Sequence, residues 1–553
     1  MPTEILLDAL RITNRYLTQN YTSSQRQMLY SELRILTDSA EMPDEAGDHH
    51  FINSPYDEIQ LALACLNEKE SIRKDKGVYY TPSDIVQFIL TNSVKMACIK
   101  RGPDSLSDMD LGGVPYGAFC YRKTVYDPTC GTGVFLVAAL EMKLGMLARY
   151  QVSATRGRIR QIVATIRGND LNSDSVAITK LRLFLCVLHR YGVAKARGLA
   201  QLLNTCFTVC DFVTHAPDAG VRYDVIIGNP PYVEDTKSES IPKEKYGNIY
   251  ANVLENAALR LQPGGVMGFI IPLSYISTPR MEKIRNVLYR HLPEQYILSF
   301  SDRPDCLFSS VHQKLCVLFG RNTGDQKKGD RARAVYTGNY RYWYREERRE
   351  LFRTIEVVKN ALGTQTHIPK LGNMRDISIY KKIMSKRTPL LELLQGGESR
   401  VYLNMRAAFW IKAFLDEHSG AEYKAFGCAD ESQANFALCL LNSSLFWWYW
   451  ICASDCWHIT RKELEGFKVP RIQDYRATKE LAAALERRLE ETKVYVGTKQ
   501  TEYEYKHRAC VAEIHRIDDY INALYGLTAE ESLYIKKFAY RYRISGGVED
   551  ECD

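Results

Sequence analysis

The chain has 553 residues, of which 45% are hydrophobic and 25% are charged, and its formal net charge is +7. These proportions are typical of globular proteins and exclude disordered, collagen-like and low-complexity classes. No apolar run reaches the roughly 18–20 residues of a membrane span, and the N-terminus lacks a signal-peptide pattern, so we expect a cytoplasmic protein with no membrane partner. The length predicts about three or four domains.

The 15 cysteines are scattered along the chain. Their only close pairs are Cys206/Cys210 and Cys452/Cys456, and neither is followed by a second pair at zinc-finger spacing. We therefore expect reduced thiols and no bound metal. The surplus of positive charge is diffuse, so it permits a nucleic-acid partner and predicts only that the binding face concentrates charge locally.

The residue pattern changes along the chain in a way that predicts four parts. Residues 1–74 carry apolar residues at helical spacing and are expected to form an N-terminal helical segment. Over residues 75–330, short β-branched runs alternate with amphipathic stretches, which predicts an α/β domain with a parallel, doubly wound sheet. All six tryptophans lie beyond residue 340, so we expect a separate mixed domain at 331–470, and the helical period of 471–553 predicts a C-terminal helical segment.

A glycine loop, Asp127 to Gly133, follows the strand predicted at residues 125–127 and opens a helix. Its two glycines, Gly131 and Gly133, allow the backbone to turn sharply and approach a ligand, and the helix N-terminus offers free N–H groups. The third glycine of a dinucleotide-binding loop and the Lys-Ser/Thr of a P-loop are both missing, which weakens those two interpretations. Asp127 is suited to bind a cationic amino group.

The next predicted strand ends at Asp170. An acidic side chain at this place in a βαβ unit can accept hydrogen bonds from both hydroxyls of a ribose. The alternative is that Asp170 caps the helix predicted over residues 173–188, and for Asp170 alone the two interpretations are equally good. Its place in the series of strand ends favours the ribose contact.

A rigid polar turn, Asn229-Pro230-Pro231-Tyr232, follows a third hydrophobic strand. The prolines fix φ and remove two N–H donors, so the Asn229 amide and the neighbouring carbonyls are held at the carboxyl end of the strand. Two acceptors beside an aromatic ring suit a planar group with an exocyclic amine: Asn229 and the Pro230 carbonyl take its two hydrogens, and Tyr232 stacks on its face. The alternative is a plain Pro-Pro turn that ends a strand.

With these motifs in this order, the chain resembles the adenine-N6 DNA methyltransferases of the Eco57I-like and TaqI-like type, in which the cofactor motif precedes the catalytic motif and a target-recognition domain follows. The resemblance covers residues 72–320 and, more loosely, 440–540. It implies a Rossmann-like methyltransferase sheet, S-adenosylmethionine as the cofactor, and a flipped-out adenine of double-stranded DNA as the target. An Asn at the start of the catalytic motif favours adenine over cytosine.

The resemblance also implies roles for individual residues. Gly77 to Pro82 looks like the opening motif of the family, and Asp211-Phe212 like the pair that flanks the adenine of the cofactor. The residues expected to bind the cofactor are Tyr80, Thr81, Pro82, Asp127, Thr129, Gly131, Gly133, Asp170, Leu171, Asp211 and Phe212. The residues expected at the catalytic centre are Asn229, Pro230, Pro231 and Tyr232, and those expected to stack on the target base are Tyr232 and Phe308.

The amino group of adenine is a poor nucleophile, because its lone pair is delocalised into the ring. Accepting both of its hydrogens on Asn229 and Pro230 favours a pyramidal nitrogen and stabilises the positive charge that develops, without covalent catalysis. A separate surface must read the duplex, and the basic and aromatic segments of residues 331–470 suit that task. The aromatic run at 446–450 is an exception, because it is better explained as domain core.

Three other functions stay open at this point. The Asn-Pro-Pro-Tyr motif also serves methyltransferases of RNA bases and of protein glutamine, which usually lack so large a C-terminal domain. A fused restriction–modification enzyme needs a nuclease, for which residues 1–74 are too short, and the third alternative is a DNA-binding relic without activity. For the main hypothesis we expect a prokaryotic, nucleoid-associated enzyme, monomeric or weakly dimeric, with or without a separate restriction endonuclease.

Overall fold

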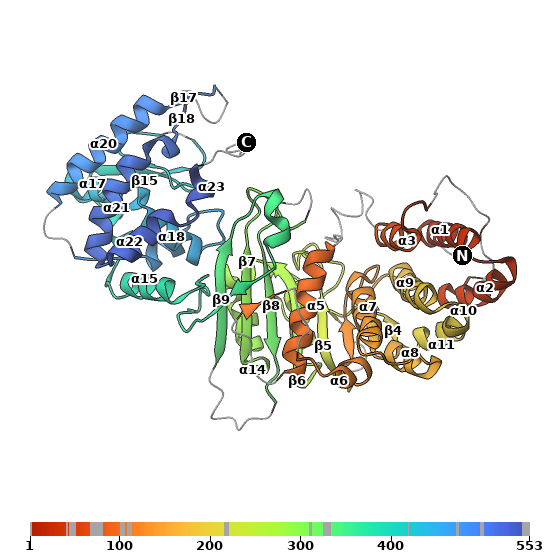
Figure 1. Ribbon diagram of the computed structural model, residues 1–553. Coiled ribbons are helices and arrows are strands. Elements are labelled where there is room, and N and C mark those ends of the chain that lie inside the picture. Colours follow the sequence, from red (N-terminus) through yellow and green to blue (C-terminus); the bar gives the residue numbers. More distant parts are fainter. Residues whose placement is uncertain are drawn as a thin grey trace.

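The computed structural model describes residues 3–39, 43, 51–66, 81–99, 105–107, 113–214, 220–308, 312–324, 333–418, 420–471, 475–497 and 503–544. Figure 1 shows three parts along the molecule: N-terminal helices at one end, a central part built on one large sheet, and a C-terminal part at the other end. The described residues therefore follow the order of the chain in space.

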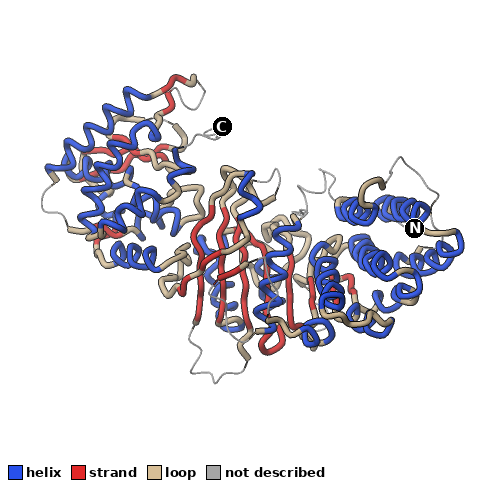
Figure 2. The backbone as a smooth tube through the Cα atoms, in the orientation of Figure 1, coloured by secondary structure: helices blue, strands red, loops and turns tan. Residues whose placement is uncertain are grey.

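The central part is built on a nine-stranded sheet with the order β11-β9-β7-β8-β6-β5-β2-β3-β4, drawn in red in Figure 2. Its strands are β2 (Val125–Asp127), β3 (Ile166–Asp170), β4 (Phe207–Val209), β5 (Tyr223–Gly228), β6 (Leu261–Pro272), β7 (Glu294–Phe300), β8 (Leu315–Arg321), β9 (Ala334–Arg341) and β11 (Val358–Lys359). Strands β2 to β6 pair in parallel, which confirms the predicted α/β fold with a Rossmann-like sheet.

The sheet is nevertheless mixed rather than wholly parallel. Strand β8 runs antiparallel to both of its neighbours, β6 and β7. It follows β7 without a crossover helix among the described residues of the connection, 301–308 and 312–314, and strands joined in this way pair antiparallel. The sheet also continues past residue 330, the predicted end of this domain, because β9 pairs with β7.

Helices cover both faces of this sheet. Side chains of successive β5 residues point to opposite faces, so Val225 and Ile227 pack with α5, whereas Ile226 packs with α12. The helices of the central part are α5 (Ser83–Cys98), α6 (Tyr116–Tyr121), α7 (Val134–Arg149), α8 (Arg156–Val163), α9 (Ser173–Tyr191), α10 (Val193–Ala196), α11 (Leu199–Asn204), α12 (Tyr250–Ala258), α13 (Ser274–Ser277), a 3-10 turn η1 (Pro279–Met281) and α14 (Glu282–His291).

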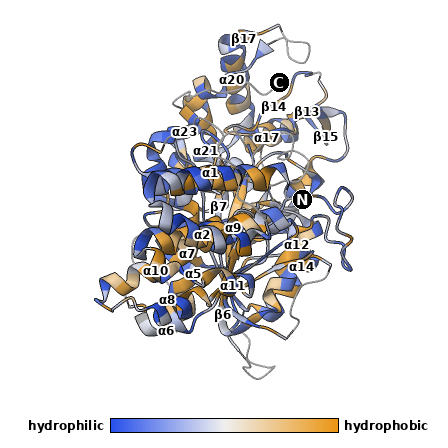
Figure 3. Cartoon of the chain, turned by 90° about the vertical axis from the view of Figure 1, so that its right-hand side faces the viewer, coloured by the Kyte–Doolittle hydropathy of each residue, from blue (hydrophilic) through white to orange (hydrophobic). Residues whose placement is uncertain are grey.

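The N-terminal helices α1 (Glu4–Asn20), α2 (Ser23–Thr37) and α3 (Pro55–Ala64) form a layer against α9. Figure 3 looks onto this end of the molecule and shows hydrophilic and hydrophobic residues alternating along α1, as expected of an amphipathic helix with one buried face. A capping box between Thr22 and Gln25 starts α2.

The C-terminal part contains mainly helices and a three-stranded sheet, β14-β13-β15. Its helices are η2 (Arg345–Glu350), α15 (Met374–Met384), α16 (Leu390–Leu393), α17 (Glu431–Asn442), α18 (Ser444–Ala453), α19 (Arg461–Gly466), α20 (Arg476–Thr492), η3 (His507–Cys510), α21 (Val511–Tyr525), α22 (Ala529–Lys537) and α23 (Tyr540–Ile544). Its three-stranded sheet consists of β13 (Ser399–Asn404), β14 (Ala413–Phe414) and β15 (Tyr423–Cys428). Short pairs join β1 (Ser105–Leu106) to β10 (Ile355–Glu356), β12 (Thr388–Pro389) to β16 (Lys468–Val469), and β17 (Val494–Tyr495) to β18 (Tyr503–Glu504).

The helices beyond residue 471 pack into the same core as α17 and α18, and this hydrophobic cluster continues into the central sheet among the described residues. The aromatic run of α18 lies in the middle of this cluster, where Trp447, Trp448 and Trp450 are at most 1% exposed. The run is domain core, as the sequence favoured, and not a stacking surface.

Within the described residues, no single helix has the length and apolarity to cross a bilayer; α17 and α18 meet that test only as a pair with a 59° bend between them.

Candidate active site

The glycine loop follows β2 and is held in a tight turn. Gly131 and Gly133 have φ values of +50° and +84°, in the left-handed region that favours glycine. A Cβ on Gly133 would lie 2.6 Å from the Thr179 side chain, whose hydroxyl donates to the Gly131 carbonyl oxygen at 2.8 Å. These contacts leave no room for a side chain at Gly133, whereas a Cβ on Gly131 would meet none of the described residues within 4 Å.

Asp170 lies at the end of β3 and is tied to the glycine loop. Its carboxylate accepts the Gly131 N–H at 2.8 Å and the Asn172 N–H at 2.9 Å. The helix α9 is capped by Asn172, whose side chain accepts the backbone N–H groups of Asp174 and Ser175. The alternative in which Asp170 caps this helix therefore does not describe the structure.

Asp127 is the buried acid of the site. It is 2% exposed, and its Oδ1 accepts the Thr129 N–H at 3.1 Å. Burial raises the pKa of its carboxyl well above the ordinary value; the Thr129 hydrogen bond opposes this shift and the nearby Asp170 adds to it. Among the described residues, the Thr129 hydroxyl is buried without a hydrogen-bond partner. A buried carboxyl and an unpaired buried hydroxyl thus lie in one loop.

The turn at residues 229–232 begins directly beside Asp127. A Cβ on Gly228, the last residue of β5, would lie 2.7 Å from the Asp127 carboxylate, so only glycine lets the two strand ends approach this closely. Asn229 Nδ2 donates to the Thr81 hydroxyl oxygen at 3.1 Å. The structure thus brings Thr81, Asp127 and Asn229 to one edge of the sheet.

Tyr232 points back into this turn. Its hydroxyl lies 2.5 Å from Asn229 Oδ1, to which it donates, and 2.9 Å from the Ile270 carbonyl oxygen of β6. Its ring is half-buried and meets Tyr250 of α12 edge-on, with ring centroids 6.4 Å apart. In this arrangement the hydroxyl occupies Asn229 Oδ1, the acceptor that the sequence motif predicts for an amino group.

The remaining residues expected at the site differ in their burial. Phe212 is 3% exposed and packs on Tyr126 with ring centroids 6.1 Å apart, so its ring faces the core. Phe308 is also 3% exposed, and Leu171 is 60% exposed beside the loop.

The Asp211 carboxylate accepts the Val213 N–H and the Thr214 hydroxyl. Pro82 precedes α5, and Tyr80 lies outside the described residues.

Hydrogen bonds connect the N-terminal layer to the glycine loop. The sequence interpretation did not predict this connection. The buried Arg182 of α9 donates to the Thr132 carbonyl oxygen at 2.5 Å and to Gln60 Oε1 of α3 at 2.9 Å. The Thr132 hydroxyl donates to the Ala64 carbonyl oxygen at 3.0 Å. One feature of the sequence could have indicated these contacts: Arg182 stands alone within the apolar stretch of α9. A charge buried at such a position requires hydrogen-bond partners from neighbouring segments.

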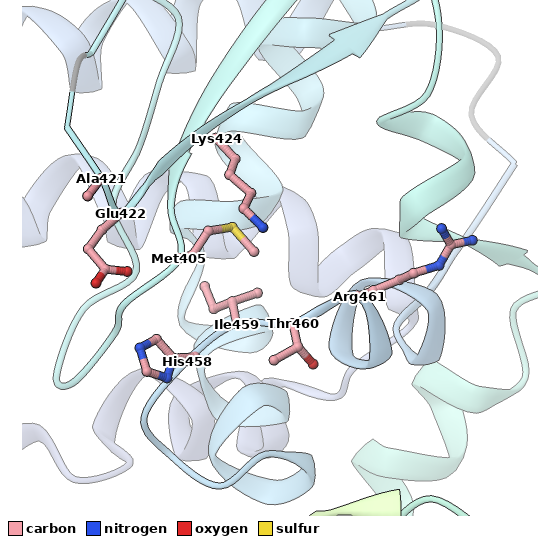
Figure 4. A pocket seen from close by; sticks show the side chains of 8 residues that line it. All are labelled: Met405, Ala421, Glu422, Lys424, His458, Ile459, Thr460 and Arg461. Carbon is pink, nitrogen blue, oxygen red and sulfur yellow. The ribbon is translucent and has the colours of Figure 1, made fainter.

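A separate pocket of about 290 Å³ lies in the C-terminal part (Figure 4). One side is formed by the segment that leads into α19, and the other by residues around β13 and β15. Its lining residues are Met405, Ala421, Glu422, Lys424, His458, Ile459, Thr460 and Arg461. The lining combines apolar side chains with charges of both signs, and none of its residues belongs to the edge that holds Asn229.

Part of the chain matches a known protein family, and the chain is similar to characterised proteins. The Eco57I restriction-modification methylase family is matched over residues 164–304, which include Asp170 and the whole turn at 229–232. The chain is similar to the type II restriction enzyme and methyltransferase RM.Eco57I of Escherichia coli, with 21% identity over 292 residues, or 44% of this chain and 28% of that protein.

Two further comparisons agree. The type II methyltransferase M.BstVI of Geobacillus stearothermophilus is 26% identical over 202 residues, or 34% of this chain and 36% of that protein. The chain thus covers about a third of the length of these curated relatives. The solved structure of the type IIL restriction-modification enzyme MmeI in complex with DNA covers 96% of this chain and 92% of its own, at 11% identity and a TM-score of 0.51. At that identity the likeness concerns the fold.

Proposed function

We propose, because the chain carries an Eco57I-type restriction-modification methylase domain, that it transfers a methyl group from S-adenosylmethionine to N6 of adenine in double-stranded DNA. The observation that carries the proposal is the position of the Asn229 amide. It lies at the end of β5, with its nitrogen held by Thr81 and its oxygen in contact with a hydroxyl donor, beside the buried Asp127.

The residues at the ends of β2 and β3 fit S-adenosylmethionine. Asp127 would bind its ammonium group, Asp170 its ribose, and the Thr129 hydroxyl supplies a further polar contact. The cofactor supplies a methyl group activated by a sulfonium charge. The chain itself contributes a loop in which Gly133 packs closely against Thr179, while the space beside Gly131 is open among the described residues.

The turn at 229–232 would activate the nucleophile. Asn229 Oδ1 and the Pro230 carbonyl accept the two amino hydrogens, which draws the nitrogen lone pair out of conjugation and stabilises the positive charge that develops. The acceptors are held by rigid prolines and cost little reorganisation at the moment of reaction. For adenine to reach them it must leave the duplex, at a cost of a few kcal/mol that stacking on Tyr232 partly offsets.

The proposed DNA face lies beside the same edge of the sheet. Two cations lie against the Trp457 ring: the Lys314 ammonium is 4.1 Å from its centroid and the Arg406 guanidinium is 5.1 Å from it. Lys314 precedes β8, and its carbonyl oxygen accepts the Leu273 N–H at the end of β6. Lys314 is paired with the buried Asp302 carboxylate at 3.1 Å. Contact with the phosphates and base edges of a duplex therefore falls to Arg406 at this ring and to Arg461 and Lys424 in the neighbouring pocket.

Asp127→Asn is expected to stabilise the protein without cofactor and to weaken cofactor binding. When a carboxyl has a higher pKa in the folded than in the unfolded protein, the free energy of unfolding falls as pH rises from the unfolded pKa to the folded pKa. The destabilisation of wild type by Asp127 is therefore largest above the folded pKa. The melting temperature of the variant should be higher by about 2–4 °C where Asp127 is ionised, and the difference should vanish below about pH 4. The Kd for S-adenosylmethionine should rise at least about tenfold, because the ammonium group loses its buried partner.

Scanning calorimetry against pH and titration calorimetry with the cofactor measure both effects of this change. Asp519→Asn is the control, because Asp519 forms an exposed ion pair with Lys536. A variant that is less stable than wild type at every pH would contradict the assignment of a buried charge penalty to Asp127.

The proposed function is tested by incubating the protein with methyl-labelled S-adenosylmethionine and, separately, duplex DNA, ribosomal RNA and ribosomal proteins. We expect label in DNA, recovered as N6-methyladenine after hydrolysis to nucleosides. Label only in RNA or protein would refute the choice of substrate. Magnesium-dependent cleavage of DNA by the same preparation would show a nuclease in addition, whereas modification without cleavage is expected of an enzyme paired with a separate endonuclease.

A further inference from the structure

The hydrogen bond between Thr81 and Asn229 joins two motifs that are 148 residues apart in the chain. Thr81 is 4% exposed and directly precedes the proline before α5. We infer that Thr81 is a positioning residue, which holds the Asn229 amide with its oxygen toward the target amino group. The inference rests on the proposed function, since it concerns the group that accepts the adenine N6 hydrogens.

An asparagine amide has a donor end and an acceptor end of nearly equal size, and a rotation of 180° exchanges them. Only the oxygen end can accept an N6 hydrogen, because the NH₂ end would present a second donor to the substrate. The productive orientation therefore requires an acceptor for Nδ2 on the other side. Thr81 Oγ1 supplies that acceptor at 3.1 Å.

The contact matters most when the base is bound. In the structure, the Tyr232 hydroxyl also holds the amide, through Oδ1 at 2.5 Å. When an N6 hydrogen replaces that hydroxyl, the Thr81 contact remains to hold the nitrogen end. Because Thr81 is nearly inaccessible to water, a side chain without an oxygen would leave the Nδ2 hydrogens unpaired in the productive orientation and would favour the reversed amide.

The test uses Thr81→Val, which removes the acceptor and keeps the shape, and Thr81→Ser, which keeps the hydroxyl. With duplex DNA and S-adenosylmethionine, Thr81→Val should lower kcat about tenfold to a hundredfold, while Thr81→Ser should stay within about threefold of wild type. A hundredfold loss corresponds to about 2.7 kcal/mol at 1.36 kcal/mol per tenfold. Titration with the cofactor tests whether Thr81→Val instead weakens binding of the methionine group of the cofactor. The inference expects the fold-loss in kcat to exceed the fold-loss in cofactor affinity.

A double-mutant cycle with Asn229→Asp decides between positioning and a general structural role. Both oxygens of a carboxylate accept, so in the Asn229→Asp background no amide needs to be oriented and Thr81→Val should cost less than about twofold. An equal cost in both backgrounds would overturn the inference, and so would an inactive Asn229→Asp enzyme, since an acceptor at this place would then not be what the reaction needs.

Failure of the proposed function can be told apart from failure of the inference about Thr81. A wild-type protein that does not methylate DNA would refute the proposed function itself, whereas wild-type activity in Thr81→Val would refute only the role of Thr81. If Thr81→Val loses its folded circular-dichroism spectrum, Thr81→Ala removes the same oxygen with a smaller side chain and enters the same cycle.

Discussion

Asn229→Ala is expected to reduce methylation of DNA by at least about a hundredfold to a thousandfold, with little change in the binding of DNA or cofactor. The substitution removes the amide oxygen that accepts an amino hydrogen, and the loss of one preorganised hydrogen-bonding group at a developing charge has effects of this size. Binding should persist because the cofactor loop and the proposed DNA face do not include this side chain. Transfer of labelled methyl groups measures the rate, and gel-shift and titration experiments measure the two affinities.

The matched control for this change is Asn53→Ala. Asn53 is exposed just before α3, and among the described residues only its backbone N–H is bonded, to Glu58. It should leave all three measurements unchanged. Methylation at the wild-type rate in Asn229→Ala would reject the proposed role of the turn. A joint loss of rate and of both affinities would instead point to a disrupted sheet edge, because Asn229 also bonds Thr81 across two elements.

The parts of the site that sequence could predict are those whose physics is local. The glycine loop and the turn at 229–232 each follow a short hydrophobic strand, and parallel pairing of β2 with β5 brings such strand ends to one edge. Gly131 and Gly133 were identifiable as positions of unusual backbone geometry, and their φ values bear this out. The alternation of strand and helix patterns is also a local feature, and it was enough to predict the α/β fold class.

The parts that sequence missed depend on contacts between distant segments. Nothing in the spacing of Thr81 and Asn229 indicates that they meet, and the brace from Arg182 to Gln60 joins residues 122 positions apart. Aromatic residues were also ambiguous, because the same ring suits a core or a binding face. Phe212 and Phe308 are buried in the structure, whereas Trp457 is half-exposed and has two cations against its ring.

Tyr232→Phe and Tyr232→Ala should differ sharply, because they separate the ring from the hydroxyl. The phenylalanine keeps a surface for stacking and removes the hydroxyl, whose single hydrogen lies within reach of Asn229 Oδ1 and the Ile270 carbonyl. Base entry must release the contact with Asn229 in wild type. Such a bond has a net value of about 0.5–1.5 kcal/mol, so Tyr232→Phe should bind the target a few times more tightly and keep its methylation rate within about fivefold. Tyr232→Ala also loses the stacking energy of about 1–3 kcal/mol and should lose about tenfold to a hundredfold in kcat/KM.

Once the methylated adenine has been mapped, 2-aminopurine at that position reports base entry by its fluorescence, independently of methyl transfer. The phenylalanine variant should reach the fully unstacked signal at lower protein concentration than wild type, because its acceptor at Asn229 is already released. The alanine variant should show a smaller signal at saturation, since nothing holds the base outside the duplex. A phenylalanine variant as impaired as the alanine variant would mean that the hydroxyl acts in the reaction itself, and that its contact with Asn229 in the structure is part of the active arrangement rather than one that base entry must displace.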